Sequence, residues 1–487
     1  MGKRMLFNSL QFAVFLPVVF AIYWALPHKG RWPLLLAASY YFYMSWNVKY
    51  VVLIVFTTVI SFFAALAMEK TDKRSRKKTI LWMTLLACLG VLFVFKYFNF
   101  FAGSLTNLFG LVGIRLHPVT LRLLLPVGIS FYTFQTLSYV IDVYRGDIRA
   151  EHNFGVYATF VSFFPQLVAG PIERTRNLLP QIKAEHRFDY HQATYGLKLM
   201  AWGFFKKLVI ADFIAAYADK VFDNVYSYRG FVLILAAFFF TIQIYCDFSA
   251  YSDIARGTAK LLGIELMENF KSPYFSASIR EFWSRWHISL STWFRDYVYI
   301  PLGGNRVGKL RHDLNLLLTF LVSGLWHGAN WTFVIWGGIH GAAQIAENRL
   351  GLRKKGETAP LLRMLRVLLV FVFSLCSWVF FRAQNIREAL YVFGHMFYGV
   401  DQPLTYLVKG LSAGKRLVTG TDGSALIRFA FFLLVLAAYD YASLKTDVIE
   451  WIGRRPALVR HGVYIALILS VLFFHAMGEV AFVYFQF

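Results

Sequence analysis

The amino-acid sequence predicts an all-α protein that crosses a membrane many times. Hydrophobic residues make up 58% of the 487 residues and charged residues only 16%, whereas about a quarter of the residues of a soluble domain are charged. Apolar runs of about 20 residues, the length needed to cross a ~30 Å hydrocarbon layer, recur along the whole chain. We therefore expect roughly eleven to thirteen transmembrane or re-entrant helices.

The predicted helices fall into three stretches of one integral membrane domain, residues 1–487. These stretches are scaffold helices at 1–115, a core with interleaved polar residues at 120–345, and C-terminal helices at 355–487 interrupted by a polar loop at 400–425. The apolar runs that we expect to form the helices are 6–26, 31–48, 50–68, 79–101, 120–141, 154–170, 194–215, 231–250, 313–336, 364–381, 426–443 and 461–485.

The formal net charge of +23 would suggest a nucleic-acid partner in a soluble protein. In a membrane protein the same excess arises because Lys and Arg accumulate in cytoplasmic loops. The loop EKTDKRSRKKT, residues 69–79, holds six basic and two acidic residues, so we place it in the cytoplasm. Residues 271–312 then also face the cytoplasm if 154–170 is re-entrant. We expect contact with membrane lipid and no nucleic-acid partner.

The three cysteines, Cys88, Cys246 and Cys376, each lie in an apolar run and follow no pairing pattern. We expect buried thiols and no disulfide framework. The sequence contains neither a His-Glu-x-x-His motif nor a Cys-x-x-Cys pair, so no metal site is predicted.

The segment FFPQLVAGPIERTRNLLPQI, residues 163–182, contains Pro165, Gly170 and Pro171. An unbroken helix is not expected there, because each proline removes a hydrogen-bond donor and clashes with the preceding turn. Broken backbone at membrane depth is tolerated only inside protein or along a wet cavity. The alternative is a kinked helix end followed by a basic cytoplasmic loop.

In the segment IQIYCDFSAYSDIARGTAKLLGI, Asp247 and Asp253 flank Ser249, Tyr251 and Ser252. We interpret it as an acidic, hydroxyl-rich turn at the end of an apolar helix. Such a turn could bind a cation or position a polar substrate. It could equally be a hydrogen-bonded network that pins two helices together, which is the role we favour for the hydroxyl groups.

The segment SIREFWSRWHISLSTWFRDYVYIPLGGNR, residues 278–306, is rich in tryptophan and basic residues, and suits a membrane interface or a re-entrant hairpin. His287 follows Trp286, and Ser291 is expected one helical turn later on the same face. PLGGNR predicts a tight turn. The alternative for His287 is a structural histidine tied to a neighbouring group.

The segment SGLWHGANWTFVIWGGIHG begins at Ser323 and carries two histidines. Asn330 and Trp331 follow His327 at i+3 and i+4, so we expect the three to share one helix face. His340 lies beyond a glycine pair and is predicted to be structural. The alternative for His327 is a buried histidine in a packed helix.

Two features of this segment point to a close-packed site that can take up a proton. Gly324 and Gly328 form a Gly-xxx-Gly pair, which lets another helix approach closely. A desolvated imidazole stays neutral at physiological pH. Such a group can accept the proton of an attacking hydroxyl group and contribute ~10²–10⁴-fold to the rate.

Taken together, GPIERTRNLLPQ, the DFSAYSDIARG…LLGIELMENFKSPY run, EFWSRWHISLSTWFRDYVYIPLGGNR and SGLWHGANWTFVIWGGIHG resemble the membrane-bound O-acyltransferase (MBOAT) family. The resemblance is strong over residues 120–345. It is greatest to the bacterial branch that acts on exported polymers such as alginate and teichoic acid. It implies a ring of helices around a tunnel that joins a cytosolic donor to an extracytoplasmic acceptor, in the bacterial inner membrane.

The resemblance also implies a reaction and its residues. An acetyl group would pass from a cytoplasmic thioester, acetyl-CoA or another acyl thioester, to an exported polysaccharide, with periplasmic acetyltransferase proteins as partners and no bound cofactor. His327 is implied as the deeper, catalytic histidine, and His287 would orient or protonate near the thioester. D-alanyl transfer to teichoic acid, or transport of donor or polymer without chemistry, are the alternatives.

Further candidates complete the predicted site. Those for the substrate or tunnel are Trp286, Ser291, Asn330, Trp331, Asp247 and Asp253. Those for phosphate groups of the donor are Arg280, Arg285 and Arg295. Anchoring at the membrane interface is the alternative role of these three arginines.

Overall fold

The computed structural model describes residues 5–115, 117, 119–351, 359–419, 424–475 and 482–483. These residues form helices and connecting loops and contain no strand, so the predicted all-α class is confirmed. The chain divides into two compact units. Unit 1 comprises Met1–Met200 and Ile254–Met267, and unit 2 comprises Ala201–Asp253 and Glu268–Phe487.

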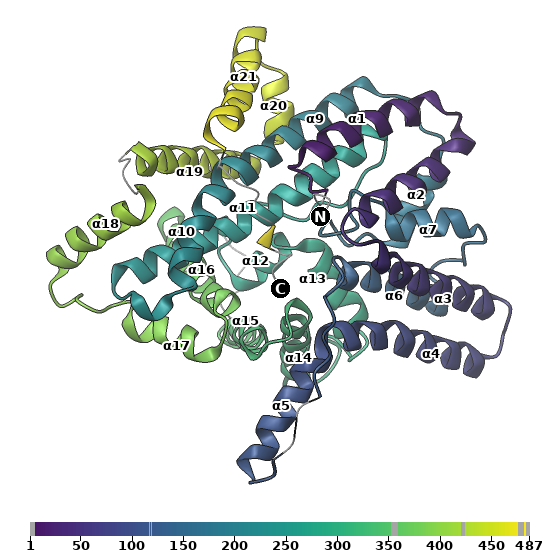
Figure 1. The fold of residues 1–487 in the computed structure, drawn as a ribbon, viewed down its shortest axis with the longest axis horizontal. Coiled ribbons are helices and arrows are strands. Elements are labelled where there is room, and N and C mark those ends of the chain that lie inside the picture. Colours follow the sequence, from purple (N-terminus) through teal and green to yellow (C-terminus); the bar gives the residue numbers. More distant parts are fainter. Residues whose placement is uncertain are drawn as a thin grey trace. The chain divides into compact units, whose positions relative to one another are not determined.

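Unit 1 is built mainly from the predicted scaffold helices. Its elements are α1 (Leu10–Ala25), α2 (His28–Met44), η1 (Val48–Tyr50), α3 (Val51–Glu69), α4 (Arg74–Leu92), the π-helix η2 (Phe93–Tyr97), α5 (Phe98–Leu111), α6 (Ile129–Arg145), α7 (Phe154–Ser162), α8 (Thr175–Lys183) and most of α9 (Tyr190–Phe204). Helices α3, α4 and α6 pack against one another side by side (Figure 1). The buried hydroxyl of Ser61 on α3 is satisfied by that of Tyr157 on α7, at 2.7 Å.

Unit 2 contains most of the polar core and the C-terminal helices. Its elements are the π-helix η3 (Phe205–Ala211), α10 (Asp212–Phe222), η4 (Val225–Ser227), most of α11 (Phe231–Leu261), η5 (Pro273–Phe275), α12 (Ile279–Arg285), α13 (Ile288–Phe294), the π-helix η6 (Arg295–Tyr299), α14 (Lys309–His327), α15 (Trp331–Arg349), α16 (Pro360–Arg382), α17 (Ile386–His395), α18 (Pro403–Thr419), α19 (Ser424–Ser443), α20 (Val448–Gly453) and α21 (Ala457–Phe474).

Within the described residues, six helical segments are long and apolar enough to cross a membrane. They are Val48–Glu69, Arg74–Leu111, Phe231–Leu261, Pro360–Arg382, Ala425–Ser443 and Ala457–Phe474. The protein is therefore polytopic, as predicted. The number is lower than the eleven to thirteen transmembrane or re-entrant helices expected, because several apolar runs form shorter helices, such as the 16-residue α1 and the 17-residue α2 and α6, or are interrupted. The run 154–170, for example, contains only the nine-residue helix α7 followed by a turn.

Helices α14 and α15 form an antiparallel pair whose backbones approach closely at two glycines. A Cβ atom on Gly324 would lie 2.2 Å from the carbonyl oxygen of Phe333, and one on Gly337 would lie 2.2 Å from that of Phe320. The predicted close approach at Gly324 is thus confirmed. Gly328 instead lies beyond the end of α14, where its missing side chain makes room for the Phe333 ring.

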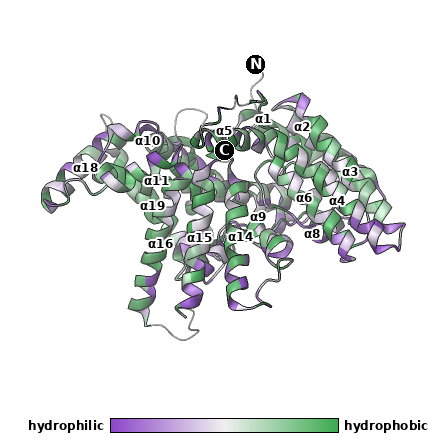
Figure 2. Cartoon of the chain, turned by 90° about the horizontal axis from the view of Figure 1, so that it is seen from below, coloured by the Kyte–Doolittle hydropathy of each residue, from purple (hydrophilic) through white to green (hydrophobic). Residues whose placement is uncertain are grey.

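Figure 2 shows α14, α15 and α16 running side by side, hydrophobic along most of their length and hydrophilic at one shared end. At that end Arg349 donates from Nε to the carboxylate of Asp313 at 2.8 Å. Charged side chains at a common end are what a membrane interface requires, because charges at the centre of the bilayer are costly.

The predicted polar loop at 400–425 is wrong, because most of it is helix α18. Its apolar residues Leu404, Leu407, Val408 and Leu411 recur every three or four positions among polar ones, which is the spacing of one helix face. Residues 420–423 of the predicted loop lie outside the described residues.

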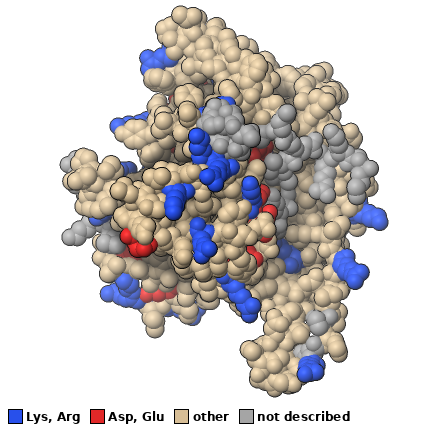
Figure 3. Space-filling model, turned by 60° about the vertical axis from the view of Figure 1, so that its left-hand side comes forward, with Lys and Arg blue, Asp and Glu red and all other residues tan. Residues whose placement is uncertain are grey.

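The basic character of the sequence is visible on the surface. On the face drawn in Figure 3, Lys and Arg side chains are scattered among uncharged ones, and acidic side chains are fewer. This agrees with the net charge of +23.

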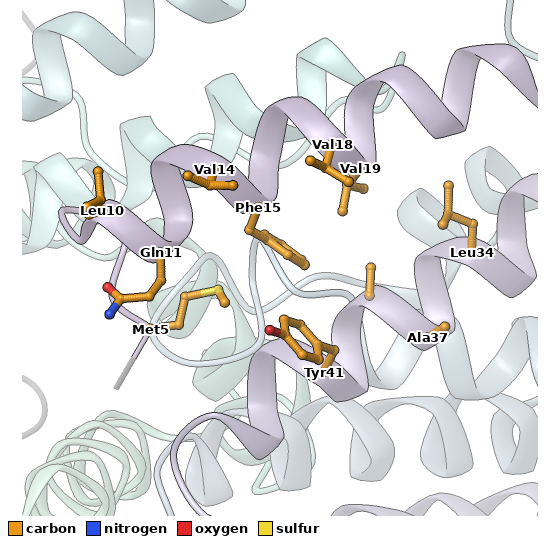
Figure 4. A pocket seen from close by; sticks show the side chains of 11 residues that line it. Met5, Leu10, Gln11, Val14, Phe15, Val18, Val19, Leu34, Ala37 and Tyr41 are labelled. Atoms are coloured by element: carbon orange, nitrogen blue, oxygen red, sulfur yellow. The ribbon is translucent and has the colours of Figure 1, made fainter. Parts of the chain in front are cut away.

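An apolar cavity of about 730 Å³ lies between α1 and α2 of unit 1. Figure 4 shows the ring of Phe15 beside that of Tyr41 in this cavity, and the two rings are stacked at 6.0 Å. Val14 and Val18 on its wall are 60% and 51% exposed, so the cavity opens on the outer surface of the helices. Its lining contains no histidine or carboxylate and does not suit acid–base chemistry.

Candidate active site

The two predicted catalytic histidines stand at helix ends in unit 2. His327 is the last residue of α14, whose C-cap is Gly328. His287 lies between α12 and α13, where it caps the N-terminus of α13 with a left-handed backbone of φ 44° and ψ 53°. A residue other than glycine in that conformation costs about 1–3 kcal/mol and persists only where its surroundings hold it.

The structure brings these histidines together. Their ring centroids are 6.3 Å apart, and the side chains are almost fully buried, with His287 0% and His327 5% exposed. The spacing of forty residues in the sequence gives no hint of this proximity.

Aromatic side chains surround the pair. Trp336 and Phe381 pack edge-on against His327 at 5.1 and 5.3 Å, and Phe248 packs edge-on against His287 at 4.6 Å. The imidazoles therefore lie in a low-dielectric environment, where electrostatic interactions with any charge that forms are stronger than in water.

Burial lowers the pKa of His287 to about 3. His287 belongs to none of the helices that are long and apolar enough to cross a membrane. Its imidazole is neutral at physiological pH, because removal from water disfavours the charged form. A neutral ring can accept a proton or a hydrogen bond at its unprotonated nitrogen.

His340 is engaged at both ring nitrogens, as its predicted structural role requires. The indole of Trp283 donates to Nδ1 at 3.2 Å, and Nε2 lies 3.0 Å from the hydroxyl oxygen of Ser377. An indole N–H can only donate, so Nδ1 carries the lone pair and Nε2 the proton. The Ser377 hydroxyl donates to the Ser374 carbonyl, which leaves its oxygen free to accept that proton.

The prediction that Asn330 and Trp331 share a helix face with His327 is wrong, because α14 ends at His327 and α15 begins at Trp331. Asn330 is the N-cap of α15, and its side chain accepts from Thr332 N–H at 3.1 Å. Its amide also donates to the Gln384 carbonyl at 2.7 Å. Trp331 is 51% exposed. These contacts give Asn330 a capping role.

Asp247 and Asp253 do not lie in a turn at a helix end, as predicted, because α11 runs through both without a break. Each carboxylate is paired with a lysine of η3. Lys206 contacts Asp253 at 2.7 Å, and Lys207 contacts Asp247 at 2.6 Å. Lys207 also contacts Asp212 at 2.7 Å, so it is shared between two carboxylates.

The helix-pinning role predicted for the hydroxyl groups is confirmed for Ser249, which lies on α11 and bonds to η3, whereas Ser252 bonds to a loop residue. Lys206 donates to the Ser249 hydroxyl at 2.8 Å, and Asn269 donates to that of Ser252 at 3.2 Å. The chain end joins this network, since the N–H of Val483 donates to Asp247 at 2.6 Å. These hydrogen bonds reduce the cost of burying the polar groups that make them.

Trp286 and Ser291 pack beside His287 in different ways. Trp286 is 2% exposed and stacks on Phe282. The Ser291 hydroxyl donates to the Trp286 carbonyl at 3.2 Å, and its N–H donates to the His287 carbonyl at 2.9 Å. Ser291 therefore closes the first turn of α13. The predicted tight turn after α13 is confirmed by the positive φ of Gly303 and Gly304.

The three candidate arginines lie on or next to α12 and α13. Arg285 contacts Glu281 one turn earlier at 2.7 Å, and Arg295 contacts the adjacent Asp296 at 2.8 Å. Arg280 is exposed near the start of α12. Partial neutralisation by their own neighbours makes Arg285 and Arg295 weaker candidates for a phosphate than Arg280.

In unit 1 the predicted break in the 163–182 segment is confirmed. Helix α7 ends at Ser162, and α8 begins only at Thr175. Between them Glu173 is fully buried, and its carboxylate accepts from Met267 N–H at 2.5 Å and from the Asn177 amide at 2.6 Å. The segment is a structured turn fixed by this carboxylate.

The cysteines are free thiols. Cys88 and Cys246 are buried as predicted, and Cys376 is half-buried. Among the described residues, no group of three or more His, Cys, Asp or Glu side chains is arranged to hold a metal ion.

Sequence reasoning missed Asn269, which lies eighteen residues before His287 and contacts its ring. The His287 Nδ1 is 3.2 Å from the Asn269 Oδ1. The only signal was its place in the quoted LLGIELMENFKSPY run, where nothing marked it out from the neighbouring Glu268 and Lys271.

Comparison with known proteins now identifies the family. The protein-family model described as "MBOAT, membrane-bound O-acyltransferase family" matches residues 37–386 of this sequence, which include both histidines. The chain belongs to the membrane-bound O-acyltransferase family. It is therefore an acyltransferase embedded in a membrane.

Three relatives illustrate the range of this O-acyltransferase family. The chain is 42% identical to the "Probable alginate O-acetylase AlgI" of Azotobacter vinelandii over 419 residues, 85% of this chain and 82% of that protein. It is 37% identical to the "Peptidoglycan O-acetyltransferase" of Helicobacter pylori over 99% of this chain and 98% of that protein. It is 29% identical to the "Teichoic acid D-alanyltransferase" of Streptococcus thermophilus over only 53% of this chain and 65% of that protein.

Proposed function

We propose that this protein transfers an acetyl group from a cytoplasmic acyl thioester, through the bacterial inner membrane, to hydroxyl groups of an exported polysaccharide. The observation that carries the proposal is the pair of buried imidazoles, His287 and His327, with ring centroids 6.3 Å apart. The names of the relatives that align over most of this chain, which refer to O-acetylation of alginate and of peptidoglycan, support the acetyl group and the glycan acceptor.

His327 acts as the general base in this proposal. Its imidazole takes the proton of an acceptor hydroxyl while the hydroxyl oxygen attacks the thioester carbonyl carbon. A C–O bond forms, the C–S bond breaks, and the sulfur leaves as a thiolate. The proton held by His327 then returns to the thiolate, so that the products are an acetyl ester and a free thiol.

In the resting protein His287 is neutral, so its role is to orient a reactant and not to act as an acid. The low pKa that burial gives it means that the ring arrives neutral. It can therefore hold a hydroxyl group as a hydrogen-bond acceptor. Protonation of the leaving sulfur by His287 would first require that it receive a proton.

The aromatic walls keep water from the thioester. Trp336 and Phe381 pack against His327, and both are at most 1% exposed. A dry site limits hydrolysis of the donor and strengthens each electrostatic interaction within it.

The donor is acetyl-CoA or another acyl thioester, which is a substrate and not a bound cofactor. Arg280 is the favoured one of the three candidate arginines to meet its phosphate groups, because Arg285 and Arg295 each contact a neighbouring carboxylate. Periplasmic acetyltransferase proteins would receive or pass on the acetyl group on the far side of the membrane.

Two glycans are candidates for the acceptor. An alginate-like polysaccharide is favoured by the identity of 42%, and peptidoglycan by alignment over nearly the full length of both chains. D-alanyl transfer to teichoic acid is less well supported, because the alignment with that relative covers only about half of this chain.

The decisive experiment replaces His327 by alanine and measures acetyl transfer to alginate and to peptidoglycan fragments. We expect His327→Ala to lower the rate by about 10²–10⁴-fold, the contribution of a general base, while the protein remains inserted and folded. His461→Ala, which removes an exposed histidine of α21, is the matched control and should retain full activity.

Release of free thiol from acetyl-CoA in the presence of acceptor distinguishes an enzyme from a transporter. A purified protein that releases no thiol with any acceptor, or a His327→Ala variant that acetylates normally, would refute the proposal.

A further inference from the structure

Three hydrogen-bond donors converge on one oxygen atom beside His287. Asn269 is 1% exposed, and its Oδ1 lies 3.2 Å from His287 Nδ1. The same oxygen accepts from the N–H of Ser289 at 3.1 Å and from its hydroxyl at 2.9 Å. The backbone of Asn269 takes part as well, since its carbonyl accepts from Ile288 N–H at 3.0 Å.

These contacts fix which way the amide of Asn269 faces. The Ser289 backbone N–H can only donate, so the atom that faces it must be the amide oxygen and not the amide nitrogen. The nitrogen then points the other way, where it donates to the Ser252 hydroxyl on α11 at 3.2 Å. The orientation follows from donor and acceptor chemistry and does not depend on telling oxygen from nitrogen.

The orientation of the amide in turn fixes the tautomer of His287. An amide oxygen has no proton to give, so the ring nitrogen that faces it must carry one. The proton of the neutral imidazole is therefore on Nδ1, and the lone pair is on Nε2. His340, by contrast, has its proton on Nε2, because an indole N–H donates to its Nδ1.

The same residue holds the backbone at His287. The left-handed backbone of His287 is strained and needs contacts that hold it in place. The two N–H groups that follow, those of Ile288 and Ser289, are both tied to Asn269, one to its carbonyl and one to its side chain. A single residue thus fixes the turn, the ring orientation and the proton position.

We propose that Asn269 is the positioning residue of the site, holding His287 as the Nδ1–H tautomer so that Nε2 presents its lone pair to the reactants. The consequence for acetyl transfer rests on the proposed function, whereas the tautomer itself is a property of the folded protein. A base or hydrogen-bond acceptor in the wrong tautomer cannot work, because it presents an N–H where a lone pair is needed.

The tautomer can be measured directly by NMR of the full-length protein labelled with ¹⁵N and ¹³C in histidine. The signals of His287 are those lost in His287→Asn, a change that the left-handed backbone tolerates. We expect an Nδ1–H ring in the unmodified protein and a mixture of tautomers in Asn269→Ala. Asn315→Ala removes another fully buried asparagine of unit 2, which bonds to the Leu302 carbonyl, and should leave the His287 signals unchanged.

The Asn269→Asp variant tests the role through the pH–rate profile, which should not change if Asn269 were purely structural. A carboxylate can accept the same three hydrogen bonds, and the Ser252 hydroxyl can turn to donate to it, so the turn should remain intact. Its negative charge next to Nδ1–H stabilises the imidazolium and raises the pKa of His287 by about 1–3 units. The acidic limb of the pH–rate profile should therefore move to higher pH.

Acetyl transfer completes the test. We expect Asn269→Ala to lower kcat by about 10- to 100-fold, as is usual for a residue that orients a reactive group, with Asn315→Ala near normal activity. An Nε2–H ring in the unmodified protein, or unchanged tautomer and pH profile in the Asn269 variants, would overturn the inference. An Nδ1–H ring combined with full activity in His327→Ala would instead refute the proposed function and leave the inference standing.

Discussion

At the scale of single residues, unit 2 shows how one side-chain type takes two roles. His287 and His340 are both fully buried. His340 has a side-chain partner on each nitrogen, from Trp283 and Ser377, and so has no lone pair or proton left for a substrate. His287 is held at Nδ1 by an amide, in a turn next to a second imidazole. Burial alone therefore does not distinguish the two roles, but the identity of the partners does.

Replacement of His340 by alanine should destabilise the protein without abolishing its catalytic activity. The indole N–H of Trp283 would lose its acceptor, and the hydroxyl oxygen of Ser377 would lose its donor. A buried polar group left without a partner costs about 1–3 kcal/mol. We expect a lower thermal unfolding temperature in detergent and near-normal activity per folded molecule. Loss of activity at unchanged stability would contradict the structural role.

At the scale of secondary-structure elements, the α14–α15 pair depends on backbone contact between two glycines. The Cβ position of Gly324 lies 3.3 Å from the Cα of Gly337 and 2.2 Å from the Phe333 carbonyl oxygen. No side chain can move aside to relieve such a contact, because both atoms belong to helix backbones. Each helix must shift as a whole if either glycine acquires a side chain.

Gly324→Ala should therefore be strongly destabilising, whereas Gly338→Ala should be tolerated. Overpacking of this kind costs typically ~1–3 kcal/mol and more where the backbone must move. A Cβ atom on Gly338 would meet only Leu321 Cδ2, at an ordinary 3.5 Å, which makes Gly338→Ala the matched control. The folded fraction after heating, measured by fluorescence-detected size exclusion, tests the difference. Equal stability of the two variants would show that the pair is not packed at Gly324.

The ends of these elements were harder to predict than their existence. The apolar run 313–336 continues across residues 328–330 without a proline or a charge, so hydropathy predicted one helix. The break depends on Asn330, whose side chain caps the next helix. Asparagine is a preferred N-cap residue, so the signal was present but weak. Likewise, the lysine partners of Asp247 and Asp253 lie 40 and 47 residues away, and no local pattern links them.

At the scale of the whole molecule, composition was enough to predict a polytopic all-α membrane protein, because no other class carries so many long apolar runs. The histidine pair was predicted through the resemblance of four motifs taken together. Spacing alone did not predict it, since the ring contact arises from two helix ends that are distant in sequence. Neither the motif resemblance nor residue spacing predicted the role of Asn269, because that role depends on hydrogen bonds that form only in the folded backbone.

The charge distribution predicts the topology of unit 1. Helix α3 has Val48 near one end of its span and the basic segment beginning at Lys70 at the other. Because basic loops stay in the cytoplasm, a cysteine replacing the exposed Ser75 should be protected from an impermeant thiol reagent in intact cells. One replacing Val48, which is 64% exposed, should be labelled from outside.

This labelling requires a background without Cys88, Cys246 and Cys376, which are buried or half-buried. Permeabilised cells provide the control, because both introduced cysteines should then react. Labelling of Ser75→Cys in intact cells, with protection of Val48→Cys, would reverse the predicted topology.

The glycine contact between α14 and α15 also has an evolutionary consequence. Because the space above each glycine is filled by the backbone of the other helix, no compensating change at the partner position can make room for a side chain. Gly324 and Gly337 should therefore not covary in an alignment of relatives. Each should be invariant on its own, whereas the neighbouring Gly338 should be replaced by other residues in some relatives. The degree of conservation at these three positions should therefore follow the backbone geometry.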